Sequence, residues 1–121
     1  MPNFIITKYD LYQHLNDKKP DKNSKYIPPV PAITLQNNIL VSIQASETHY
    51  CSPKINYGVW DSVELCIDSK YYKDVPHELL KYNQQEVECP VMGYVPIDLV
   101  VAFIIISGGI IDLGKKENED G

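Results

Sequence analysis

Arginine is missing from this 121-residue chain, and all eleven of its basic residues are lysines. The formal net charge is −5. Nucleic-acid binding needs a concentrated cationic face that neutralises phosphates, so this acidic balance argues against a DNA or RNA partner. Without a guanidinium fork, a bound anion must be held by lysine ammonium groups, backbone N–H groups or neutral polar side chains.

Long apolar runs are also scarce. The longest, Leu99 to Ile106, has eight residues, far fewer than the roughly 20 that span a bilayer. The first residues lack the charged and apolar regions of a secretory signal. The three cysteines, Cys51, Cys66 and Cys89, are odd in number and do not suggest a disulfide framework. These features predict no membrane association and a reducing, cytoplasmic location.

The length and the 44% hydrophobic content predict a single α+β domain, with a small antiparallel sheet and a C-terminal apolar helix. We expect an N-terminal helix and proline-rich linker over residues 1–31, an α+β core over 32–113 and a disordered tail over 114–121. Thr7 can cap the first helix, which should run through Leu15. Asp10, at the third helical position, suits a capping box.

The core begins with two β-compatible runs, Ala32–Gln36 and Ile39–Ser46. They are joined by Asn37-Asn38, residues that tolerate positive φ, so a hairpin is predicted. In the second run, apolar odd-numbered residues alternate with even-numbered residues that supply hydroxyls and an amide, so one face is available for function. The clearest strand is Val59–Asp68. Its alternation assigns one face to Val59, Val63, Leu65 and Ile67, and the other to Trp60, Ser62, Glu64, Cys66 and Asp68.

Weaker patterns follow. Residues 71–85 carry no clear periodicity, and Glu86–Val95, interrupted by Pro90 and Gly93, suits an edge strand or a bulge. Pro96–Ser107 is predicted as a helix stopped by Gly108-Gly109, with a strand as the competing prediction because β-branched residues are frequent. A helix that is apolar on nearly every side must be enclosed or must pair with another copy. We therefore expect a homo-oligomer formed through residues 96–111.

Catalytic and metal-binding patterns are weak. His49 and Cys51 could form a nucleophilic pair, but no known signature surrounds the cysteine, and a loop cluster packed by its own side chains is preferred. Zinc would need His49, Cys51, Cys66, His77 and Cys89 to converge without any C-x-x-C pair. Phosphate-cradling glycine motifs are absent. We expect no catalytic residue, no metal and no cofactor.

A polar and aromatic cluster is the best candidate for a binding site. Such side chains can stack on a planar base, bond to its edges and place one cation near a phosphate. The alternative is an amphipathic loop that only covers a sheet edge. The candidate ligand-binding residues are Gln44, Ser46, His49, Tyr50, Lys54, Asn56, Tyr57 and Trp60.

The block SIQAS-x-x-HYC-x-P at residues 42–53, with Gly93-Tyr94-Val95-Pro96 and Gly108-Gly109-Ile110, resembles a group of short phage and prophage proteins. The match covers about residues 41–111. Phage proteins of this kind look like the Thoeris anti-defence sponges, which sequester cyclic nucleotide immune signals. The resemblance implies an oligomer in the host bacterial cytoplasm that captures a ligand without turnover. Lys54 departs from it, since an arginine is expected after the HYC-x-P block.

The leading hypothesis is a non-enzymatic, phage-type protein that binds a small nucleotide-like ligand near His49 to Trp60. An anti-CRISPR-like inhibitor, which would bind a host protein directly through its acidic surface, is the alternative. A thiol enzyme that uses Cys51 is a third hypothesis, which alkylation and a Cys51→Ser variant can test.

Overall fold

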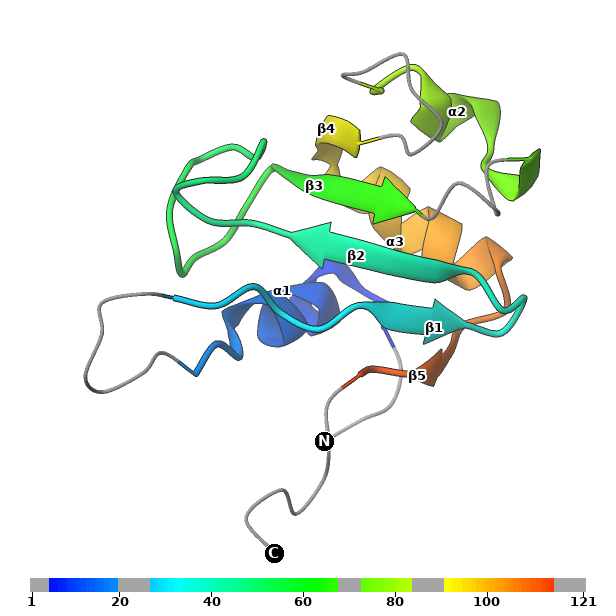
Figure 1. Cartoon of the computed structure of the whole chain (residues 1–121), viewed down its shortest axis with the longest axis horizontal. Coiled ribbons are helices and arrows are strands. Elements are labelled where there is room, and N and C mark those ends of the chain that lie inside the picture. The colour runs from blue at the N-terminus through cyan, green and yellow to red at the C-terminus, as the bar shows by residue number, and fades with distance from the viewer. Residues whose placement is uncertain (1–4, 20–26, 68–72, 84–90, 115–121) are drawn as a thin grey trace, which may run out of the picture.

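The computed structural model describes residues 5–19, 27–67, 73–83 and 91–114. Five antiparallel strands form one sheet in the order β4-β3-β2-β1-β5. Figure 1 shows α1 and α3 together behind the sheet. The predicted α+β class is therefore confirmed. The elements are α1 (Lys8–Asn16), β1 (Ile33–Leu35), β2 (Leu40–Gln44), β3 (Ser62–Ile67), α2 (His77–Leu80), β4 (Val91–Pro96), α3 (Ile97–Ile106) and β5 (Ile110–Asp112).

The first helix begins where the sequence predicts. The Thr7 side chain accepts a hydrogen bond from the Asp10 N–H, and the Asp10 carboxylate accepts one from the Thr7 N–H. This reciprocal capping box satisfies backbone donors that the first turn leaves without helical partners. Leu11 and Leu15, four residues apart, are fully buried. The helix is thus fixed at its start by the cap and along its length by one apolar face.

The predicted hairpin is present, with a longer turn. Ile33 pairs with Val41 and Thr34 with Leu40, and the Leu35 N–H donates to the Ile39 carbonyl. The loop therefore contains Gln36 as well as the two asparagines. The Asn38 N–H donates to the Leu35 carbonyl, and Asn38 has φ 70°. A three-residue loop with a left-handed third residue is the usual next choice after a two-residue turn.

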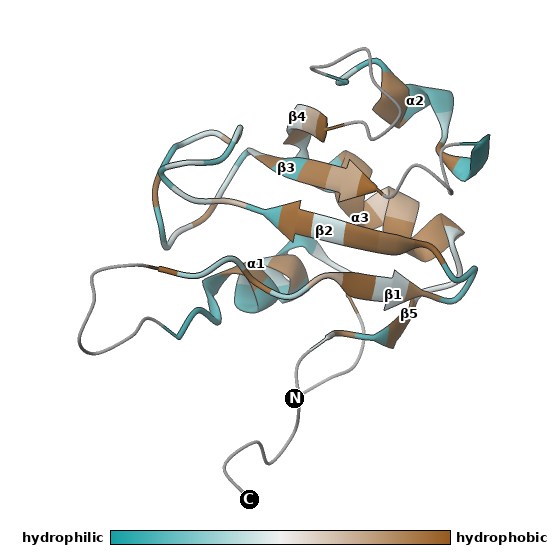
Figure 2. Cartoon of the chain, in the orientation of Figure 1, coloured by the Kyte–Doolittle hydropathy of each residue, from teal (hydrophilic) through white to brown (hydrophobic). Residues whose placement is uncertain are grey.

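The sheet buries one face of each central strand. In β2, Val41 and Ile43 are buried, and in β3 Val63, Leu65 and Ile67 are fully buried. Figure 2 shows apolar residues along β2 and α3, both of which contribute side chains to the core. The predicted alternation is correct within β3 but was extended too far at its start. Val59 is 65% exposed and Trp60 is fully buried, because the chain before Ser62 is not a strand and its side chains need not alternate.

The C-terminal apolar segment is a helix, as predicted. Pro96 stands at its N-cap and Asp98 in its first turn. At its other end, Gly108 and Gly109 adopt φ near 90° and donate to the Ile105 and Ile104 carbonyls. Glycine takes this left-handed backbone without steric cost, which is why the helix ends here. No helix among the described residues is long and apolar enough to cross a membrane.

The packing of α3 changes the argument for a homo-oligomer. Val100 and Ile104 are fully buried within one chain, and Ile97, Val101 and Phe103 are nearly so. The sheet and α1 thus enclose most of a helix that was expected to need a second copy. The large apolar side chains of α3 that stay exposed are at its end, where Ile105 and Ile106 are 51% and 80% accessible.

β4 is an edge strand whose register against β3 shifts between Val63 and Leu65, as the glycine and proline pattern predicted. Two elements, α2 and β5, were not predicted. Both are short and carry too few residues to show a period. The predicted edge-strand residues 86–90, among them Cys89, lie outside the described residues.

Candidate functional site

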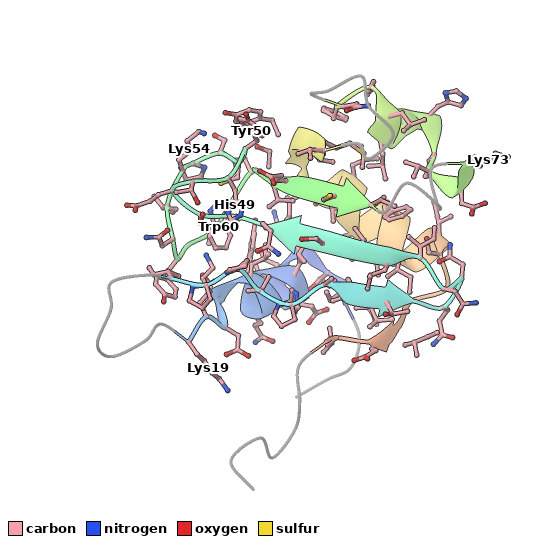
Figure 3. The ribbon with its side chains drawn as sticks, in the orientation of Figure 1. Lys19, His49, Tyr50, Lys54, Trp60 and Lys73 are labelled. Carbon is pink, nitrogen blue, oxygen red and sulfur yellow. The ribbon has the colours of Figure 1, made fainter. Side chains whose placement is uncertain are left out.

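The candidate residues lie in and beside the long connection between β2 and β3, residues 45–61. Ser52, near the middle of this loop, pairs with the chain at the start of β3: its N–H donates to the Ser62 carbonyl at 3.2 Å, and its carbonyl accepts from the Asp61 N–H at 2.8 Å. Figure 3 shows Tyr50 and Lys54 at the outer rim of the loop, with His49 and Trp60 deeper in it. The predicted cluster is therefore brought together in one region but divides into an inner and an outer part.

Gln44 belongs to the inner part and corrects the prediction that its strand face is free. Its side chain is buried, and its amide oxygen accepts from the Val30 N–H at 3.0 Å. Its amide nitrogen donates to the Val30 carbonyl at 2.8 Å and to the Ser42 hydroxyl at 3.0 Å. One side chain thereby pairs both backbone groups of a neighbouring segment. Both the oxygen and the nitrogen of its amide are therefore used in hydrogen bonds within the fold.

Trp60 also serves the fold. It is fully buried, and its indole N–H donates to the Ile55 carbonyl at 3.2 Å. Its own carbonyl accepts from the Tyr12 hydroxyl at 2.8 Å. The prediction had placed this ring on an accessible face of a strand. Because the chain at residue 60 has not yet entered β3, the ring turns inward and packs near Tyr12.

Ser46, His49 and Cys51 form a compact group beneath the rim. The Ser46 hydroxyl lies 2.6 Å from His49 Nδ1 and accepts from the Thr48 N–H at 3.1 Å. The buried Cys51 thiol donates to the Ser46 and Pro53 carbonyls at 3.2 and 3.4 Å. Burial lowers the pKa of His49 and raises the pKa of Cys51.

These contacts bear on the nucleophilic pair considered from sequence. A reactive cysteine needs a lowered pKa and an imidazole within reach of its thiol. Here the His49 Nδ1 faces Ser46, and the Cys51 thiol is bonded to carbonyl oxygens in a site that disfavours the thiolate. The group is arranged as an internal hydrogen-bond network that shapes the loop.

The outer part contains an exposed pair of tyrosines and a lysine, which we call the tyrosine–lysine clamp: Tyr50, Tyr94 and Lys54. The two rings are 44% and 41% exposed, with centroids 6.0 Å apart and planes at 44°. The Lys54 ammonium lies 5.4 Å from the Tyr50 centroid and 5.8 Å from that of Tyr94. These distances are within the range of cation–π attraction.

The clamp is held by two hydrogen bonds, one between its two tyrosines and one to the Glu64 side chain of β3. The Tyr94 N–H donates to the Tyr50 carbonyl at 3.0 Å, and the Tyr50 N–H donates to the Glu64 carboxylate at 2.8 Å. Tyr94 was not among the predicted site residues, because β4 lies far along the chain. Its φ of 56° turns it away from a regular strand. The preceding Gly93, which suggested a bulge, was the available signal.

Asn56 and Tyr57 lie on the other side of the loop, near α1. The Asn56 side chain accepts from the Glu47 N–H at 3.1 Å, and its carbonyl accepts from the Lys18 ammonium. Lys18 also lies 5.4 Å from the Tyr57 centroid. Burial lowers the pKa of Lys18. These residues do not join the clamp and instead connect the loop to the N-terminal segment.

The zinc-binding hypothesis has no support in the part of the chain that the structure describes. No three His, Cys, Asp or Glu side chains there are grouped to hold an ion. Of the zinc candidates, Cys89 lies outside these residues.

No family model, curated protein or solved structure matches this chain.

Proposed function

We propose that this protein is a non-enzymatic binding protein that captures a small nucleotide-like ligand at the tyrosine–lysine clamp. The observation that carries the proposal is the clamp itself, in which Lys54 lies beside the exposed rings of Tyr50 and Tyr94. A planar base can stack on tyrosine, and an adjacent ammonium can pair with a phosphate. The resemblance to phage sponges of cyclic nucleotide signals agrees with this chemistry.

The charge at the clamp restricts the ligand. Lys54 contributes one positive point charge, without the forked donors of an arginine. Glu64 bonds to the Tyr50 N–H, so a carboxylate lies beneath the same rim. A ligand with a planar ring and one accessible phosphate group suits this balance better than a densely charged polyphosphate, which would meet the carboxylate.

Capture without turnover is part of the proposal. The nucleophile and base that a thiol mechanism would use, Cys51 and His49, are held by Ser46 and by loop carbonyls. We therefore assign them to the frame beneath the clamp. The biological role that follows is sequestration of an immune signal in the cytoplasm of a bacterial host.

Self-association is the second part of the proposal. The exposed apolar side chains at the end of α3 and in β5 are Ile105, Ile106 and Ile111. They come from the 96–111 segment, and we propose that copies of the chain meet there. Sizing chromatography with light scattering tests this directly, because Ile106→Glu would place a charge in such a contact and shift the protein toward monomer.

Calorimetry with a panel of cyclic and linear mononucleotides tests the binding site. We expect Lys54→Gln and Tyr94→Ala each to weaken binding by roughly tenfold or more, since a charge-assisted contact or a stacked ring is lost. Lys73→Gln is the matched control, because Lys73 is exposed on the opposite side of the molecule (Figure 3). It should bind as the wild type does.

The same preparation distinguishes the leading proposal from direct inhibition of a host protein. A sponge should release an ultraviolet-absorbing small molecule on heating, and mass spectrometry would identify it. If the wild type binds no nucleotide of the panel at high micromolar concentration and releases no such molecule, the binding proposal fails. A stoichiometric host protein in a pull-down would then favour the inhibitor hypothesis.

A further inference from the structure

Lys18 has an unusual environment for a lysine near the surface. It is only partly exposed, and its ammonium group donates to the Ala45 carbonyl at 2.6 Å and to the Asn56 carbonyl. The same group lies 5.3 Å from the Trp60 ring and 5.4 Å from the Tyr57 ring. Two carbonyl oxygens and two aromatic faces therefore surround one positive charge.

Groups of these two kinds suit an ammonium ion. Carbonyl oxygens accept its N–H donors, and the negative faces of aromatic rings attract its charge. Neither of the two hydrogen-bond acceptors is a carboxylate, so direct pairing with an acid does not explain why the side chain lies there. All four groups come from the loop between β2 and β3, and the two carbonyls come from distant points along it. An ion held between them joins the start of the loop to its far side.

The end of α1 holds the same loop by neutral contacts. The Asn16 side chain donates to the Gly58 carbonyl and accepts from the Gly58 N–H, each at 2.9 Å. The Tyr12 hydroxyl bonds to the Trp60 carbonyl. Lys18, two residues beyond Asn16, therefore reaches the loop from a helix end that is already docked against it, which reduces the loss of freedom on placing its ammonium.

We infer that Ala45, Asn56, Tyr57 and Trp60 form a cage for a primary ammonium group, that Lys18 occupies it from the same chain, and that this occupancy fixes the loop carrying Tyr50 and Lys54. The effect on ligand capture rests on the proposed function. The cage itself does not, since its occupancy can be measured without any nucleotide.

Hydrogen exchange and tryptophan fluorescence test the cage. Trp60 is the only tryptophan of the chain and reports directly on the ring beside the ammonium. The Glu47 and Gly58 amides, which donate to Asn56 and Asn16 side chains, report on the loop. In Lys18→Ala we expect both amides to exchange roughly tenfold faster, because two charge-assisted hydrogen bonds are lost. The neighbouring Lys19 is exposed and points away from the loop (Figure 3), so Lys19→Ala should match the wild type.

Chemical rescue makes the test specific. Ethylammonium carries the three N–H donors of a lysine side chain and should restore the fluorescence and slow exchange of Lys18→Ala in a saturable manner. Tetramethylammonium at the same ionic strength has no N–H donor and should not. Should Lys18→Ala lose its circular dichroism, Lys18→Met, which keeps the aliphatic stem, takes its place in the exchange and fluorescence measurements.

The inference is overturned if the Lys18 variant exchanges like Lys19→Ala, or if ethylammonium and tetramethylammonium have the same effect on it. Failure of the proposed function would look different. The wild type would bind no nucleotide, or Lys54→Gln would bind as the wild type does, while the Glu47 and Gly58 amides of Lys18→Ala still exchanged faster. A Lys18 variant with faster exchange but unchanged nucleotide affinity would keep the cage and refute its link to capture.

Discussion

Gln44 provides the sharpest test of how this fold is held together. Its amide pairs with both backbone groups of Val30, a residue that is itself buried. Gln44→Met keeps the length and most of the volume of the side chain but removes its donor and acceptor. The Val30 N–H and carbonyl would then be left buried without these partners, in a segment whose neighbouring prolines lack donors of their own.

The expected loss follows from the number of groups left without a partner. A buried backbone donor or acceptor that loses its hydrogen bond costs roughly 1–3 kcal/mol, so two such groups should lower the free energy of unfolding by about 2–6 kcal/mol. That is a large share of the roughly 5–15 kcal/mol that stabilises an ordinary domain. Urea titration followed by circular dichroism measures it, and the slope of the transition should not change.

The control for Gln44→Met is Gln13→Met, at an exposed position of α1. Exposed substitutions of this kind usually stay within about 0.5 kcal/mol of the wild type. If Gln44→Met unfolds within about 0.5 kcal/mol of Gln13→Met, Gln44 is not a structural bridge. That result would favour the sequence prediction that Gln44 binds the ligand. A large loss of stability with unchanged nucleotide affinity of the folded variant would place it in the frame.

Two further predictions concern the group beneath the rim. Burial holds the pKa of His49 below its usual 6.5, so the fold favours the neutral ring. The stability that this gives should be lost as the pH falls below about 6.5 and through the folded-state pKa. Between about pH 7.5 and pH 5.5, His49→Gln should therefore lose less unfolding free energy than the wild type, and an equal loss would contradict this. The Cys51 thiol is buried, and desolvation raises its pKa. Followed by peptide mass spectrometry, it should react with iodoacetamide at least tenfold more slowly in native protein than in urea. Equal rates would mean that the thiol is accessible and reactive.

Local signals were sufficient for several elements. Thr7 and Asp10 are three residues apart, and that spacing alone defines the capping box. Asn38 lies between two apolar runs and tolerates the positive φ of a hairpin turn. The two glycines after Ile106 end α3 because they accept a left-handed backbone. In each case, the residues that decide the conformation are neighbours in the chain, so the sequence order carries the information.

The site was less predictable because its contacts join distant segments. Tyr94 reaches Tyr50 across 44 positions of sequence, and Lys18 reaches Asn56 across 38. The alternation that assigned Gln44 and Trp60 to an accessible face describes a strand, not what covers it. Gln44 is covered by the segment at Val30, and Trp60 precedes the strand. Side-chain type thus identified the loop, whereas the tertiary fold decided which members reach solvent.

The left-handed backbone of Tyr94 has a consequence for how this protein can be improved or can evolve. A side chain with a Cβ pays about 1–2 kcal/mol at such a φ, and glycine pays far less. Selection for thermal stability alone would therefore favour Tyr94→Gly, which removes half of the exposed aromatic pair. If the clamp holds the ligand, stability and affinity compete at this one residue, and variants chosen only for heat resistance will lose binding.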